Sequence, residues 1–109
     1  MIQNLSQLKR EIRSNSRLEI VGHWRKDFIG QIRQITHSSS NAFYSLPLDL
    51  SAEEKSHLNE GKGYIMWWGK ASAWEFENGV CSVYQCDLPH TENNLIMAFR
   101  VLTEQMEAA

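Results

Sequence analysis

The dipeptide Asn78-Gly79 is the feature of this sequence that most constrains its fold. It lies between two runs of alternating polarity, residues 74–77 and 80–83. A two-residue type I′ turn needs positive φ at both central positions, and Asn followed by Gly adopts such a turn most readily. The dipeptide therefore predicts a β-hairpin. It also sets the register, in which the opposed pairs are Glu77 and Val80, Phe76 and Cys81, Glu75 and Ser82, and Trp74 and Val83.

This register divides the hairpin side chains between two faces, because successive residues of a strand point in opposite directions. The side chains expected to be buried are those of Trp74, Phe76, Cys81 and Val83. The side chains expected to face water are those of Glu75, Glu77, Ser82 and Tyr84. One buried face and one solvated face are typical of an antiparallel sheet.

The segment 64–68, which precedes the hairpin, is predicted to be a strand with two apolar faces. Tyr64, Met66 and Trp68 point to one side, and Ile65 and Trp67 point to the other. Either a helix covers the outer face, or an aromatic patch is exposed there. Large exposed apolar patches are uncommon on monomers, which favours the covering helix. Both interpretations remain open at this point.

The rest of the chain predicts helices and strands in the order α-β-β-β-α-β-β-β-α. The expected strands before the hairpin cover 18–24, 28–36, 42–46 and 64–68, and the expected helices cover 4–14, 51–60 and 94–107. Asn4 is a suitable N-cap for the first helix, and Ser51 with Glu54 forms a capping box for the second. An apolar stripe at helical spacing, formed by Leu95, Ile96, Phe99, Leu102 and Met106, predicts the third.

Two of these strands carry details that bear on the surface. Strict alternation over 18–24 places Leu18, Ile20 and Trp24 on one face and turns His23 toward solvent. The isoleucines at 29, 32 and 35 are spaced by three, so one bulge near Ile32 or Arg33 is needed to reconcile them with a strand.

Together these elements predict one α+β domain over residues 1–109. Five or six short antiparallel strands are expected to curl into a small SH3-like or OB-like barrel, flanked by the N- and C-terminal helices. An open sheet covered on one side by the two terminal helices is the alternative.

Charge and hydropathy narrow the function classes. Among the 109 residues, 22% are charged, and the net charge of −2 gives no global support for binding to nucleic-acid phosphates. No apolar run is long enough to cross a membrane, and the N-terminus lacks the apolar core of a signal peptide. The sequence therefore predicts a cytoplasmic protein.

No specific catalytic or metal-binding pattern is present. The glycines do not have phosphate-loop spacing, and the four histidines are scattered along the chain. Cys81 and Cys86 are predicted on opposite faces of one strand, about 16 Å apart at ~3.3 Å per residue, which prevents a disulfide or a shared metal. We expect no catalytic residues, metal or cofactor. A small thiol enzyme that uses Cys86 and His90 is the alternative.

The strongest functional signal is a combination of aromatic and basic side chains. Trp, Tyr and Arg are enriched at interface hot spots. The residues expected to contact a partner are Trp24, Arg25, Lys26, Tyr64, Trp67, Trp68 and Lys70. The same residue types also stack on single-stranded bases or nucleotides, form homodimer seams, or simply fill a core, and these alternatives stay open.

Three segments carry a resemblance to other proteins. They are Leu-Glu-Ile-Val at 18–21, Ser-Asn-Ala-Phe-Tyr at 40–44 and Trp-Trp-Gly-Lys-Ala-Ser-Ala-Trp-Glu-Phe at 67–76. Over residues 5–86 the chain resembles small uncharacterised proteins encoded by phages and prophages of Gram-positive bacteria. The resemblance implies a protein that binds, and inhibits or redirects, a macromolecule in the cytoplasm of a bacterial host.

The sequence thus predicts a non-enzymatic binding protein of phage or mobile-element origin. Its partner is expected to be a host protein, bound through the aromatic face of the sheet. The acidic balance favours a protein partner over bulk DNA.

Overall fold

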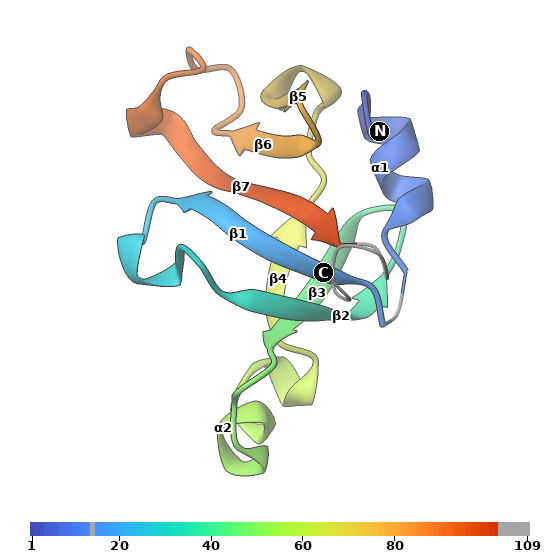
Figure 1. Ribbon diagram of the computed structural model, residues 1–109, viewed down its shortest axis with the longest axis vertical. Coiled ribbons are helices and arrows are strands. Elements are labelled where there is room, and N and C mark those ends of the chain that lie inside the picture. The colour runs from blue at the N-terminus through green and yellow to red at the C-terminus, as the bar shows by residue number, and fades with distance from the viewer. Residues whose placement is uncertain (14, 103–109) are drawn as a thin grey trace.

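The computed structural model describes residues 1–13 and 15–102, which form one curved sheet with short helices at its margins (Figure 1). The strands are β1 (Arg17–His23), β2 (Ile32–Ser38), β3 (Ala42–Pro47), β4 (Tyr64–Trp67), β5 (Trp74–Glu77), β6 (Val80–Tyr84) and β7 (Leu95–Leu102). The helices are α1 (Leu5–Glu11) and α2 (Ala52–Ser56), with 3₁₀ turns η1 (Lys26–Phe28), η2 (Asn59–Gly61), η3 (Ala71–Ala73) and η4 (Glu92–Asn94).

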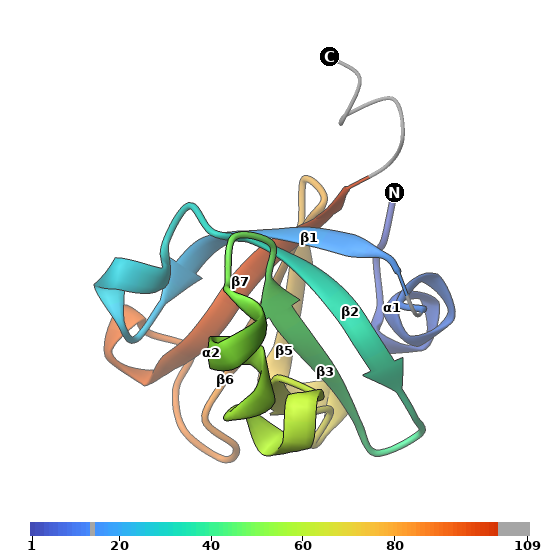
Figure 2. The ribbon, with the colours of Figure 1, turned by 90° about the horizontal axis from the view of Figure 1, so that it is seen from below.

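The sheet is antiparallel throughout and has the order β4-β3-β2-β1-β7-β6-β5. Figure 2 shows the strands curving around a common interior, with α1 beside one open side. The α+β class is therefore confirmed. The predicted barrel is wrong, because the two outer strands β4 and β5 do not pair with each other, and the prediction of five or six strands is wrong because the sheet contains seven strands.

The additional strand is β7, which occupies residues that the sequence predicts to be helical. β7 lies between β1 and β6 and pairs with both. Met97, Ala98 and Phe99 are buried one after another, so the period-2 alternation of a half-exposed strand is missing. The predicted helix 94–107 is thus wrong over 95–102, and its remainder lies outside the described residues.

The hairpin prediction is confirmed in both turn and register. Asn78 and Gly79 have φ of 52° and 80°, as a type I′ turn requires. The opposed pairs are Trp74 with Val83, Glu75 with Ser82, Phe76 with Cys81 and Glu77 with Val80. Trp74, Cys81 and Val83 are buried as expected, and Phe76 packs against the core from a half-buried position.

The N-terminal helix begins as predicted but ends at Glu11 rather than at residue 14, and it covers part of the core. The Asn4 side chain accepts a hydrogen bond from the Gln7 backbone N–H at 2.8 Å, as an N-cap does. Leu8 and Ile12 are buried in the same cluster as Trp68, and Lys9 Nζ lies 5.7 Å from the centre of a Trp68 ring. This helix therefore acts as a cover over the inner face of the sheet.

The second helix begins as predicted and ends early. The Ser51 hydroxyl accepts a hydrogen bond from the Glu54 N–H at 3.2 Å, so the capping position is confirmed. The helix ends at Ser56 rather than near residue 60, and η2 follows it. In Figure 1 this segment projects away from the sheet. Neither helix of the described part is long and apolar enough to span a membrane.

Bulges in the central strands change which side chains face inward. In β1 the register with β7 shifts between Ile20 and Gly22, so the alternation inverts after Ile20. His23 is consequently buried and Trp24 is exposed, the reverse of the sequence prediction. In β2 the bulge falls between Ile35 and His37 rather than near Ile32.

Gly63 provides a test of the path that leads into β4. Its φ is +106°, and an added Cβ would overlap the Ser45 carbonyl oxygen and come within 2.8 Å of Leu46 Cγ. Gly61 is a matched control, because its φ is +86° but open space surrounds it. We expect Gly61→Ala to lower the free energy of unfolding by about 1 kcal/mol. Gly63→Ala should lower it by at least about 2 kcal/mol more, measured by urea denaturation. Equal losses would contradict the close approach of Gly63 to β3.

Candidate functional site

A cavity of about 220 Å³ opens where the end of β1, η1 and β4 meet the start of β7. We call it the Arg33 pocket. Its aromatic and basic lining residues are His23, Trp24, Arg25, Phe28, Arg33 and Tyr64. The rest of its lining comprises Ser45 and apolar side chains of β4 and β7. The pocket therefore combines positive charge with aromatic and aliphatic walls.

The unusual member of this set is Arg33, whose side chain is only 3% exposed. It stands on β2 two residues before Ile35, and the alternation of the strand turns both side chains inward. Arg33 Nε donates a hydrogen bond to Gln31 Oε1 at 3.1 Å. Within residues 1–13 and 15–102, Arg33 Nη2 is the one buried side-chain nitrogen or oxygen without a hydrogen-bond partner.

Aromatic rings surround the charge of Arg33. Its guanidinium carbon lies 4.5 Å from the centre of the Tyr64 ring and 4.9 Å from that of Phe28. The Arg25 guanidinium lies 4.3 Å from the same Phe28 ring. Cation–π contacts of this kind hold a cation electrostatically, but they do not give an N–H donor an oxygen acceptor. A donor therefore remains unsatisfied at the pocket.

Burial lowers the pKa of Arg33 to about 10, because removal from water disfavours the charged form. A group with that pKa still carries its proton at neutral pH. The pocket thus holds a full positive charge that no carboxylate of the described residues neutralises through an ion pair.

His23 adds a second polar group to the pocket. Its Nδ1 accepts a hydrogen bond from the Arg25 backbone N–H at 2.9 Å, which places the ring proton on Nε2. Burial lowers the pKa of His23 below 6.5, and the charges of Arg33 and Arg25 lower it further. The neutral imidazole is therefore favoured at physiological pH.

The structure brings together only some of the residues predicted to contact a partner. Trp24, Arg25 and Tyr64 line the Arg33 pocket, with Trp24 68% exposed at its rim. Lys26 follows in the chain, and its Nζ lies 3.3 Å from Glu92 Oε1. These residues form one contiguous surface around the pocket.

The other three predicted residues do not line this pocket. Trp67 is 61% exposed at the end of β4, and Lys70 forms an ion pair with Asp87 at 3.1 Å. Trp68 is 1% exposed, and its Nε1–H donates to the Ser39 carbonyl oxygen at 2.8 Å. The prediction of Trp68 as a contact residue is corrected accordingly, because its indole is satisfied within the core.

The set of residues expected to contact a partner did not include three aromatic and basic residues of the pocket: His23, Phe28 and Arg33. A signal for Arg33 was present, because this basic residue stands among isoleucines at 29, 32 and 35. A charge embedded in an apolar strand is either exposed by a bulge or buried for a reason. The bulge lies beyond Ile35, which leaves Arg33 buried.

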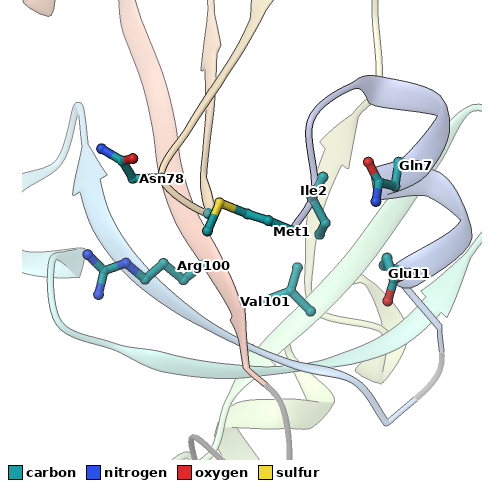
Figure 3. Close-up of a pocket in the computed structure, with 8 residues that line it drawn as sticks. Met1, Ile2, Gln7, Glu11, Asn78, Arg100 and Val101 are labelled. Atoms are coloured by element: carbon teal, nitrogen blue, oxygen red, sulfur yellow. The ribbon is translucent and has the colours of Figure 1, made fainter.

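A larger hollow of about 530 Å³ lies elsewhere, between α1, β7 and the turn of the hairpin. Figure 3 shows Met1 and Ile2 between Arg100 and Val101 of β7 and Gln7 and Glu11 of α1. None of its lining side chains is fully buried, and none is an unsatisfied polar group. This hollow therefore lacks the buried, unpaired polar group that distinguishes the Arg33 pocket.

The alternative thiol site would use Cys86 and His90, and Cys81 is the second cysteine of the chain. Burial raises the pKa of Cys81 to about 12, which keeps that thiol unreactive. Cys86 is exposed. His90 Nδ1 lies 2.8 Å from Glu75 Oε1, and its ring stacks on Tyr84 at 4.4 Å. The described part of the chain contains no group of three His, Cys, Asp or Glu side chains that is arranged to hold a metal.

Comparison with protein-family models, with curated proteins and with solved structures finds no match to this chain.

The burial of Arg33 leads to a stability test. Burying an unsatisfied donor costs about 1–3 kcal/mol, and replacement of buried charges by apolar groups is often neutral or stabilising. We expect Arg33→Met to leave the free energy of unfolding unchanged or raise it by about 1 kcal/mol. The control, Ile35→Ala on the same face, should lower it by about 2–5 kcal/mol. Urea denaturation monitored by circular dichroism measures both. A loss in Arg33→Met as large as that of the control would show that Arg33 serves stability.

The lowered pKa of His23 predicts a pH dependence. An unfolded His titrates near 6.5, whereas the folded state keeps His23 neutral to lower pH. The stability that this difference contributes is complete above pH 6.5 and is lost as pH falls toward the folded-state pKa. His23→Gln should therefore lose less free energy of unfolding between pH 7.5 and pH 5.5 than the wild type, measured by urea denaturation at each pH. The same loss in both proteins would refute the assignment to His23.

Proposed function

We propose that this protein is a non-enzymatic binding protein and that it binds a protein partner at the Arg33 pocket and its rim. The observation that carries the proposal is the exposed Trp24 side chain beside a pocket that contains a buried, incompletely hydrogen-bonded guanidinium. Interface hot spots combine such an aromatic anchor with a desolvated polar group.

The exposed indole of Trp24 is not required by the core of the fold. The bulge in β1 places Trp24 outside the core, where its indole contributes little to folding. A large aromatic side chain gains free energy when a partner covers it, because apolar area is removed from water. Trp24, Arg25 and Tyr64 belong to the residue types that dominate binding energy at protein interfaces. Their proximity supports a protein-binding role.

The alternative, a single-stranded nucleic-acid or nucleotide binder, is less well supported. It needs free cations near the aromatic residues to contact phosphates. Arg25, Lys26 and Lys70 each lie within 3.3 Å of a carboxylate oxygen, those of Asp27, Glu92 and Asp87 respectively. A phosphate that contacted these three side chains would have to compete with their carboxylates, and the remaining cation of the pocket, Arg33, is buried.

The proposed origin and location follow from the resemblance over residues 5–86. A phage or prophage protein acts inside the bacterial host, so we propose a host protein as the partner and the bacterial cytoplasm as the place of binding. Inhibition or redirection of that host protein is the consequence we infer from binding.

The test compares three single-site variants. Affinity capture from a Gram-positive host lysate identifies candidates, and titration calorimetry with the purified candidate then measures the dissociation constant. We expect Trp24→Ala to raise that constant at least ~30-fold, equivalent to about 2 kcal/mol. Leu88→Ala is the matched control, because Leu88 is exposed and does not line the pocket. Trp67→Ala separates this surface from the outer face of β4.

The results distinguish the proposed surface from the outer face of β4, from nucleic-acid binding and from self-association. Loss of binding in Trp67→Ala with full binding in Trp24→Ala would place the contact on β4 and overturn the proposal. Quenching of tryptophan fluorescence by oligonucleotides, with strong salt dependence, would favour the nucleic-acid alternative. Light scattering on the isolated protein shows whether the partner is a second copy of this chain.

A further inference from the structure

We propose that the Arg33 pocket is a carboxylate-binding site that receives one acidic side chain of the protein partner. The inference rests on the proposed function for the source of the carboxylate. The existence of the site rests on the pocket alone.

The guanidinium of Arg33 has a hydrogen-bond donor without an acceptor. Arg33 is nearly fully buried, and Nη2 has no hydrogen-bond partner while Nε is bonded to Gln31. Buried polar groups in native proteins are almost always hydrogen-bonded. A guanidinium is a donor without acceptor capacity, and its planar fork matches the two oxygens of a carboxylate. An anionic acceptor with two oxygens matches this group in both charge and geometry.

The charged side chains that line the pocket favour a negatively charged occupant. The titratable and charged groups that line the pocket with Arg33 are His23, Arg25 and Tyr64, none of which is an acid near neutral pH. The nearest acid in the chain sequence, Asp27, pairs with Arg25 at 3.3 Å. A carboxylate that enters would therefore meet a positive field with no competing acid in the lining.

The volume of the pocket limits the size of its occupant. A cavity of about 220 Å³ lies below the ~300–1,000 Å³ of pockets that enclose a drug-sized ligand. It suits a group the size of one side chain. Trp24 stands exposed at the rim, so an occupant that extends out of the pocket meets further apolar surface. A side chain on a larger partner fits this arrangement better than a free small molecule does.

The charge of the pocket favours a carboxylate over a phosphate. A phosphate monoester carries between one and two negative charges at neutral pH. Arg33 is the buried cation of the pocket, the other lining cation, Arg25, is paired with Asp27, and the neutral form of His23 is favoured. Ile65, Met66, Ile96 and Met97 provide apolar walls that disfavour a second charge. A monoanion with an aliphatic stem, such as the side chain of Glu or Asp, matches both the charge and the walls.

The probe for the site itself is N-acetyl-glutamate N-methylamide, with N-acetyl-glutamine N-methylamide as its neutral isostere. We expect the acid to bind with a millimolar dissociation constant and to shift the Nε–Hε resonance of Arg33 in ¹H–¹⁵N spectra. Binding should also raise the pKa of His23, because a negative charge nearby favours the imidazolium. The glutamine analogue should produce no saturable shift.

Two variants keep the experiment decisive. Arg33→Met should weaken binding of the acid at least tenfold. Arg33→Lys retains a cation but loses the planar fork, so it should bind with intermediate affinity. Equal shifts from the acid and its isostere, or unchanged binding by Arg33→Met, would overturn the carboxylate site. Tighter binding of inorganic phosphate than of the acid would assign the pocket to phosphate instead.

The partner then tests the source of the carboxylate. Neutralising the acidic residues of the purified partner one at a time should identify a single position whose loss weakens binding at least tenfold in the wild type and little in Arg33→Met. If no such position exists while Trp24→Ala abolishes binding, the proposed function stands and this inference fails. If the acid probe binds but Trp24→Ala leaves partner binding unchanged, the pocket stands and the proposed function fails.

Discussion

The contact between Trp68 and Trp74 is the constraint on which the rest of this structure depends. β4 and β5 lie at opposite edges of the sheet, yet they follow one another in the chain, joined by residues 68–73. A connection of that length spans at most about 25 Å, so the sheet must curve until its edges approach. Trp74 Nε1–H donates to the Trp68 carbonyl oxygen at 2.7 Å, and the two indoles lie 6.0 Å apart in the core. The interior that results is the space at whose edge the Arg33 pocket opens.

The bulge in β1 decides which aromatic side chains this interior takes up. Before the bulge, Leu18 and Ile20 point inward; after it, His23 points inward and Trp24 points outward. A one-residue slip exchanges the two faces of a strand, because the side-chain period is two. The interior therefore receives an imidazole where alternation would have placed an indole. The indole becomes the most exposed tryptophan side chain of the four.

The burial of Arg33 is expected to lower the stability of the fold. A buried guanidinium without a full set of acceptors lowers stability, and an apolar side chain would pack at the same place at lower free energy. Natural proteins depart from such rules mainly at functional or strained sites. Phe28 and Tyr64 reduce the cost through cation–π contacts, but they do not give Nη2 a hydrogen-bond acceptor. The proposed binding function is our explanation for this arrangement.

The sequence by itself determined the local features of this protein. The Asn78-Gly79 turn, the hairpin register and the caps at Asn4 and Ser51 depend on neighbouring residues, so their chemistry can be read directly. Tertiary structure alone decided the rest. β7 became a strand because pairing with both β1 and β6 outweighs helical spacing. Ala98 is buried together with its neighbours Met97 and Phe99, so the alternation that would have revealed this strand is missing. The bulge that buries His23 and exposes Trp24 forms between β1 and β7, which lie far apart in the chain. Gly22 is a local signal for a bend in the strand, but it does not specify which side chains are exchanged.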